Sequence, residues 1–229
     1  METLHNGFTL DTAPGCFPLS TDSMLLSGFA SAPKDARILD LGSGCGTLGL
    51  LLCAKDPRCR VTGVEISPLA HEAALDNIRR NTLDLRMESI CADLRTIPTL
   101  FPASSFDCCV SNPPYFSGGP ASEAAPFARR DDCCSPEDLF RAAAWSLKFG
   151  GTFFLVHKPE RLAQLCGLAC ACNLEPKRLQ LVRHQPGKEV NLILLACRKG
   201  GKPGLHWEEL CLFDEDGQPT PQYRNIYHL

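Results

Sequence analysis

The sequence contains no long apolar run: none approaches the roughly 18 consecutive residues that a membrane-spanning helix needs. Residues 1–10 lack the basic stretch followed by an apolar core that is typical of a signal peptide. The 14 cysteines include no CxxC pair and no Cys/His set with zinc-finger spacing. These absences predict a cytoplasmic protein outside the membrane, with no metal site and with reduced cysteines that act as small hydrophobic residues.

The sequence also lacks an excess of positive charge, since its formal net charge is −3. The charge is unevenly distributed, however. Residues 158–202 hold nine Lys and Arg against three Glu, a local balance of +6. Such a segment is either a surface that faces phosphate groups or an ordinary solvated face, and composition alone leaves both open.

Apolar runs alternate with helical patterns along most of the chain. Strands are predicted at 36–41, 60–65, 87–91, 106–111, 152–157, 177–183 and 190–197. Helices are predicted at 48–54, 68–81, 136–148 and 160–172, two of them opened by a Ser-Pro start. We therefore expect an α/β fold of the Rossmann-like class, with a seven-stranded, mostly parallel sheet between two helical layers.

Two connections modify this picture. The last two strands are joined by a short turn around Pro186–Gly187, and only antiparallel neighbours can be joined so tightly. We therefore expect an antiparallel strand at one edge of the sheet.

Residues 117–132 are rich in Gly, Ala, Pro and Ser, which makes them a candidate for a mobile lid.

A glycine-rich turn follows the first predicted strand, in the sequence Asp40-Leu-Gly42-Ser-Gly44-Cys-Gly46. Glycines let the backbone turn tightly and approach a ligand closely. Glu65 ends the second strand, 19 residues after Gly46, where its carboxylate can accept hydrogen bonds from both hydroxyls of a ribose. The pattern therefore predicts a nucleoside-containing cofactor.

Residues 44–49 also satisfy G-x-G-x-x-G, the fingerprint of dinucleotide-binding proteins, so the glycines alone leave a dinucleotide as an alternative. Asp40 and Asp93 favour S-adenosylmethionine instead. A carboxylate at Asp40 suits a ligand with an ammonium group and no pyrophosphate, and Asp93 can accept a hydrogen bond from an adenine amino group. A negatively lined pocket suits a sulfonium and disfavours a pyrophosphate.

The fourth predicted strand ends in Asn112-Pro113-Pro114-Tyr115, which indicates the chemistry. The first and fourth strands meet at the switch point of a doubly wound sheet, so this tetrapeptide should face the glycine turn. The Asn112 side-chain oxygen and the Pro113 carbonyl can accept the hydrogens of a planar amine and offset the charge that develops on attack. The prolines fix the backbone and offer no N–H, and Tyr115 offers a face on which a base can stack. An ordinary Asn-Pro turn is the alternative.

Taken together, these motifs resemble the class I S-adenosylmethionine-dependent methyltransferases that act on amino nitrogens. Residues 17–26, 128–130, 199–205, 213–217 and 225–227 extend the resemblance to bacterial tRNA adenine-N6 methyltransferases, which modify the adenine beside the anticodon of a valine tRNA. The resemblance implies an enzyme with tRNA as its partner, for which the basic 158–202 segment, Arg129 and Arg130 are candidate contacts. Position 130 is Arg where that family usually has His. The cofactor residues that it implies are Thr21, Asp22, Asp40, Gly42, Gly44, Gly46, Glu65, Asp93, Leu94 and Asn112.

We expect a single methyltransferase domain over residues 1–229. Residues 1–35 would cover the cofactor, 36–205 would form the core, and 206–229 would be a C-terminal extension. Because only about 35 residues precede the first strand, we expect no helical domain of the kind found in enzymes that methylate a glutamine of release factors. Protein glutamine methylation stays an alternative, as does a non-catalytic RNA-binding protein with this fold.

Overall fold

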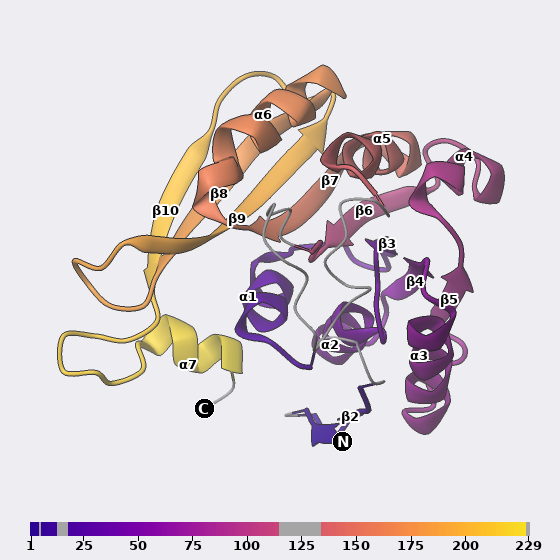
Figure 1. Cartoon of the computed structure of the whole chain (residues 1–229), viewed down its shortest axis with the longest axis horizontal. Helices are drawn as coiled ribbons and strands as arrows, with labels where there is room; N and C mark the ends of the chain where they lie inside the picture. Colours follow the sequence, from indigo (N-terminus) through magenta and orange to yellow (C-terminus); the bar gives the residue numbers. More distant parts are fainter. Residues whose placement is uncertain (5, 13–17, 115–133, 228–229) are drawn as a thin grey trace.

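A computed structural model describes residues 1–4, 6–12, 18–114 and 134–227. An eight-stranded sheet runs through the molecule, with helices on both of its faces (Figure 1). In spatial order the strands are β10 (His206–Cys211), β8 (Leu174–Arg183), β9 (Val190–Lys199), β7 (Leu147–His157), β6 (Phe106–Ser111), β3 (Arg37–Leu41), β4 (Arg60–Glu65) and β5 (Met87–Cys91). A separate two-stranded sheet pairs β1 (Glu2–Thr3) with β2 (Thr9–Leu10).

The predicted α/β class is confirmed, with two corrections to the sheet. It has eight strands and not seven, because β10, in the expected C-terminal extension, pairs in parallel with β8. The antiparallel strand does not lie at the edge. The hairpin from β8 to β9 inserts β9 between β7 and β8, and β10 then covers the outer side of β8.

The helices divide between two hydrophobic layers. The bounds are α1 (Thr21–Phe29), α2 (Thr47–Lys55), α3 (Pro68–Arg80), α4 (Ile97–Leu100), α5 (Pro136–Ser146), α6 (Leu162–Ala171) and α7 (Pro221–Tyr227), with short 3-10 turns η1 (Leu94–Thr96) and η2 (Pro159–Arg161). The first three helices bury their apolar side chains on one face of the sheet, and α4, α5 and α6 cover the other. Cys108 and Cys109 are adjacent on β6, and each packs into a different layer as a small apolar side chain would.

The predicted Ser-Pro starts are confirmed. Ser67 caps α3 and Ser135 caps α5, each with proline in the first turn. The end of α5 differs from the prediction, because β7 begins at the fully buried Leu147 and runs through the glycine pair that was expected to stop the helix. Gly150 has φ +80° there, so the strand passes through the glycines instead of starting after them.

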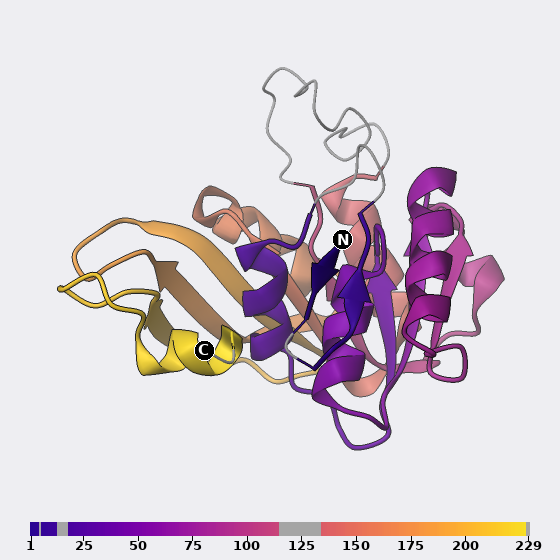
Figure 2. The same cartoon turned by 90° about the horizontal axis from the view of Figure 1, so that it is seen from below.

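The N-terminal strands lie beside α1, α2 and α3, and α7 lies beside α1 (Figure 2). Within the described residues, no helix is long and apolar enough to cross a membrane. The cysteines in the described ranges are free thiols, and no cluster of His, Cys, Asp or Glu in those ranges could hold a metal ion.

Candidate cofactor and catalytic site

Four neighbouring parallel strands have their carboxyl ends on the same side of the molecule. Strands β7, β6, β3 and β4 run in the same direction, so they end on this side at His157, Ser111, Leu41 and Glu65. The Ser111 hydroxyl donates a hydrogen bond of 2.7 Å to the carbonyl of Leu41, which fastens the end of β6 to the end of β3. The crevice outside such strand ends is where open α/β sheets bind their ligands.

Asp40 lies next to the end of β3 and is only 1% exposed. Neither carboxylate oxygen accepts a hydrogen bond of good geometry from a described residue, although the nearby Gly49 N–H favours the anion in part. Burial, reinforced by the negative charge of Glu65, raises the pKa of Asp40 to about 8. An unsatisfied buried carboxylate of this kind would be stabilised by a cationic ligand group.

The glycine turn lies between β3 and α2, and its predicted glycines have the conformation that the motif requires. Gly44 has φ +55°, and Gly46 has φ +82° at the N-cap of α2. The positive φ at Gly46 disfavours any other residue there, and a Cβ atom would also lie 2.8 Å from the end of the Met87 side chain, which would have to move. Gly42, with φ +75°, opens the same turn.

Glu65 connects this turn to the next strand. Its carboxylate accepts hydrogen bonds from the backbone N–H of Gly44 (2.9 Å) and from that of Ser67 (2.8 Å). The structure therefore brings Glu65 and the glycine turn together, as the spacing predicted. Ile66, the next residue, is 44% exposed on this side of the molecule and was not among the predicted site residues. Its signal in the sequence was an apolar residue directly after the strand-ending acid.

Asp93 follows β5 in a different environment. Its carboxylate accepts hydrogen bonds from the Arg95 backbone N–H (2.8 Å) and from the Arg95 guanidinium, which is itself largely exposed. These bonds from Arg95 lower the pKa of Asp93. Leu94 begins η1 and is partly buried against the apolar layer of α5 and α6. Asp93 is thus satisfied by its own loop.

Asn112 follows β6 directly, and its side chain reaches across to α1. The amide nitrogen of Asn112 donates a hydrogen bond of 3.1 Å to the hydroxyl of Ser23, which is 6% exposed. Ser23 is bonded in turn to Ser20, the N-cap of α1. With its nitrogen committed to Ser23, Asn112 keeps its side-chain oxygen as an acceptor. Pro113 is buried and Pro114 partly so, whereas Tyr115, Arg129, Arg130 and the 117–132 segment lie outside the described residues.

Thr21 and Asp22 form the first turn of α1, beside the last turn of α7. Burial raises the pKa of Asp22, and Lys158 opposes the shift. The Tyr227 side chain is within hydrogen-bonding reach of Thr21, and burial raises its pKa to about 12. In the last turn of α1, Ile226 fills the space over Gly28, leaving 3.1 Å to a Cβ at that position. Ser23 and Tyr227 were not singled out from the sequence, because the resembling segments 17–26 and 225–227 in which they lie gave these two residues no role.

Residues 9–165, more than half of the chain, match the family described as the methyltransferase small domain. The chain belongs to this methyltransferase family. A tRNA1(Val) (adenine(37)-N6)-methyltransferase of Bacteroides fragilis is 33% identical over 172 residues, which cover 74% of this chain and 72% of the relative. The protein of the same name from Tolumonas auensis is 31% identical, in an alignment that covers 94% of this chain and 90% of that protein.

Solved structures agree with the fold of this methyltransferase. A predicted O-methyltransferase from Agrobacterium tumefaciens superposes with a TM-score of 0.76 at 22% identity, covering 91% of this chain and 96% of that one. A geranyl diphosphate C-methyltransferase from Streptomyces coelicolor, solved in complex with S-adenosyl-L-homocysteine, gives a TM-score of 0.57 at 14% identity and covers 77% and 76%. At such identities the likeness is one of fold.

The cofactor of this methyltransferase is S-adenosylmethionine, and its residues fit that molecule. Among the described residues, neither oxygen of the buried Asp40 carboxylate has a hydrogen-bond donor of good geometry, and this group suits a cationic ligand better than a pyrophosphate. The turn is open at Gly42 and Gly44, where a Cβ would meet no described atom within 4 Å, and Glu65 lies beside it. Membership of the methyltransferase family therefore decides against the dinucleotide alternative, and the buried Asp40 carboxylate agrees with that decision.

Proposed function

We propose that this methyltransferase transfers a methyl group to the N6 amino nitrogen of an adenine in tRNA. The relatives named above act on adenine 37 of a valine tRNA by their names, and they support the substrate class. The observation that carries the chemistry is the orientation of Asn112. Its amide nitrogen is held by Ser23, so its oxygen is available to an N–H donor such as an exocyclic amine.

S-adenosylmethionine supplies an electrophilic methyl group on a sulfonium. The chain's own residues would hold it: the Asp40 carboxylate opposite its positive charge, Glu65 at the ribose, and the glycine turn along its length. Asp93 and Leu94 are proposed to lie at the adenine, and Thr21 and Asp22 at the covering N-terminal segment 1–35. Ile66 would add apolar contact because it is exposed beside Glu65.

The adenine amine is a poor nucleophile because its lone pair is delocalised into the ring. Asn112 Oδ1 and the Pro113 carbonyl would accept its two hydrogens and draw the nitrogen toward tetrahedral geometry. These acceptors would stabilise the positive charge that grows on nitrogen, a kind of preorganised electrostatic effect worth on the order of 10²–10³ in rate. Tyr115 would stack on the base. The product cation loses its proton readily, so no strong general base is needed.

We propose that only part of the basic 158–202 segment contacts tRNA, namely the cations near the carboxyl ends of the parallel strands. Lys158 and Arg161 follow β7, and the exposed Lys188 lies in the turn after β8. Lys177 and Lys199 lie toward the opposite end of the sheet, where Lys177 donates to the Lys202 carbonyl and Lys199 to two carbonyls of the α5–β7 junction. The cations near the carboxyl ends would therefore contact phosphates near the catalytic end of β6, together with Arg129 and Arg130.

The test is transfer of a labelled methyl group to two substrate pools by the purified protein. We expect incorporation into tRNA that lacks the modification, and N6-methyladenosine as the only new nucleoside in a mass-spectrometric digest. Incorporation into a peptide release factor but not into RNA would replace the proposal with glutamine methylation. Cofactor binding without transfer to either pool would indicate a non-catalytic protein.

A further inference from the structure

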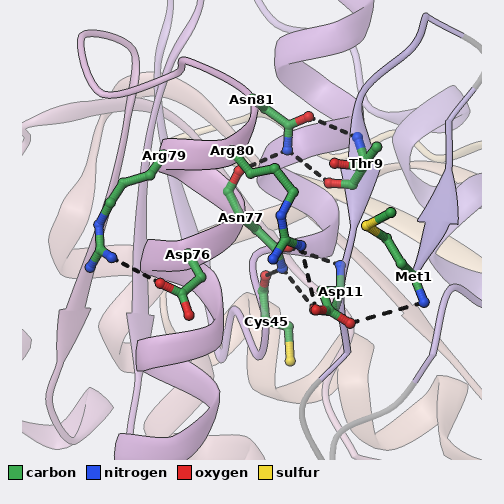
Figure 3. Close-up of polar contacts among 9 residues, drawn as sticks. All are labelled: Met1, Thr9, Asp11, Cys45, Asp76, Asn77, Arg79, Arg80 and Asn81. Atoms are coloured by element: carbon green, nitrogen blue, oxygen red, sulfur yellow. Dashed lines mark hydrogen bonds and ion pairs between the residues drawn. The ribbon is translucent and has the colours of Figure 1, made fainter.

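Asn77 is a fully buried polar residue in the last turns of α3, and all its side-chain hydrogen bonds go to the backbone of other segments (Figure 3). Its oxygen accepts from the Asp11 N–H at 2.8 Å. Its nitrogen donates to the Asp11 carbonyl at 2.9 Å and to the Cys45 carbonyl at 3.0 Å. One amide group therefore links the N-terminal segment to the middle of the glycine turn.

Asn81, one helical turn further, offers a close comparison. Its oxygen accepts from the Thr9 N–H (2.7 Å), and its nitrogen donates to the Thr9 carbonyl (2.8 Å). Its remaining bond goes to the Asn77 carbonyl within its own chain segment and not to the glycine turn. The two asparagines hold the same N-terminal strand in the same way, and only Asn77 also holds the turn.

The glycine turn depends on α3 for support at two adjacent residues. Cys45, bonded by Asn77, lies between Gly44 and Gly46, both with positive φ. Ala74, one turn before Asn77 on the same face of α3, is fully buried and would lie 3.5 Å from a Cβ at Gly46. Glycine backbone is intrinsically free, so a fixed turn needs contacts of this kind from a rigid element.

We propose that Asn77 is a positioning residue that couples the N-terminal segment to the glycine turn, so that a ligand seated on the turn also fixes residues 9–11. The proposal rests on the cofactor site described above. Coupling between two sites is reciprocal, so docking of the N-terminal segment would also favour the turn geometry that binds the cofactor. Because Asn77 acts through Cys45 and Asp11, it would not itself touch the reacting atoms.

The first test needs only the unaltered protein and S-adenosylhomocysteine, the reaction product, as the probe. Hydrogen exchange of the Asp11 amide, which is bonded to Asn77, should slow at least about fivefold on saturation, together with the amides of the turn. Slower exchange in the turn without a change at Asp11 would overturn the coupling alone. A failure of the probe to bind at all would overturn the proposed function, and this inference with it.

Matched variants then separate coupling from loss of the N-terminal strand. Asn77→Ala should raise the Kd for S-adenosylhomocysteine about 5- to 10-fold, the range expected for loss of its one bond to the glycine turn, and abolish the ligand-induced protection at residues 9–11. Asn81→Ala should speed exchange at Thr9 but change the Kd less than about twofold and keep the ligand effect. Equal effects of the two variants on the Kd would contradict the proposal. If Asn77→Ala fails to fold, the exchange experiment on the unaltered protein decides.

Discussion

The central and outermost strands of this sheet end in acidic residues with opposite surroundings. Asp40, next to the end of central β3, is buried, and its oxygens have no good hydrogen-bond donor among the described residues. Asp93, after the edge strand β5, is partly exposed and fully engaged by Arg95. Burial raises the pKa of the first to about 8, whereas bonds from Arg95 lower the pKa of the second.

This difference indicates that the two acids contribute unequally to cofactor binding. A buried charge without a partner costs free energy, so Asp40 is expected where a ligand brings the partner. An exposed carboxylate with a local arginine costs little and can exchange one hydrogen bond for another. We therefore expect large effects of substitution at the central strand ends and small effects at the edge.

The largest effect is expected at the end of β6. Asn112→Ala should lower kcat about 10²- to 10³-fold, because it removes an acceptor for the amine in the transition state. The Kd for S-adenosylmethionine should change less than about threefold. Single-turnover kinetics and calorimetry measure the two quantities separately, and a loss of cofactor binding equal to the loss in rate would contradict the catalytic role.

At Asp40, Asp40→Asn should raise the Kd for S-adenosylmethionine about 30- to 100-fold, as expected for a charge-assisted contact worth about 2–3 kcal/mol. The variant keeps the shape of the side chain and removes its charge. Binding of a neutral adenosine, measured in parallel, should change little. An equal loss for adenosine would indicate that the variant has disturbed the turn and not the charge.

The raised pKa of Asp40 also predicts pH dependence. Its folded-state pKa, about 8, lies above the ordinary value of 3.8, so the folded protein retains this proton longer and loses stability as pH rises between about 4 and 8. The melting temperature of Asp40→Asn relative to the unaltered protein should therefore increase over that range. Cofactor binding needs the anion, so the ratio of the two Kd values should grow up to about tenfold per unit from pH 6 to 8. A flat ratio would contradict the assignment.

A smaller effect is expected from the contact that orients Asn112. Ser23→Ala should lower kcat about 3- to 10-fold without changing the cofactor Kd, because the amide then loses one fixed bond. Ser23→Thr, which keeps the hydroxyl, should recover part of the rate. Ser27→Ala is the matched control, since the Ser27 hydroxyl donates to the Met24 carbonyl within α1 and to no other described residue. Equal losses in both alanine variants would point to a general effect on the helix.

The smallest effect is expected at the edge strand. Asp93→Asn should raise the cofactor Kd no more than about threefold, because the amide oxygen can still accept a hydrogen bond and the lost pair with Arg95 is exposed. Arg95→Ala should leave the Kd unchanged or lower it, since it frees the carboxylate. If Asp93→Asn raised the cofactor Kd as much as Asp40→Asn does, the proposed difference between the two strand ends would be wrong.

The sequence predicted the part of the fold that rests on local pattern. Strands 60–65, 87–91 and 106–111 were predicted at their observed bounds because each is a short segment with several apolar residues between turn residues. Strand β10 and helix α7 were missed because their residues are largely exposed and show little apolar periodicity. Helix α1 was placed only as a covering segment, although Ser20 gave the signal of an N-cap.

In the candidate site, too, some residues could be predicted from the sequence and others could not. The glycine turn, Asp40, Glu65 and Asn112 could be selected because motif spacing brings strand ends together in this fold. The bond from Asn112 to Ser23 joins residues 89 apart and belongs to no motif. Asn77 sits in a polar stretch that suggests an exposed helix face, and only the packing of the N-terminal strand buries it. Such contacts depend on the tertiary structure, so sequence motifs and periodicity do not predict them.

The contact between α1 and α7 also has a kinetic consequence. Tyr227 and Thr21 are about 200 positions apart (227 − 21 = 206), so their contact closes a very long loop. Contacts between such distant residues form late, once the intervening sheet has brought them near each other. During refolding, the sheet and the packing of α1 on it should therefore recover before the contact between Thr21 and Tyr227 forms.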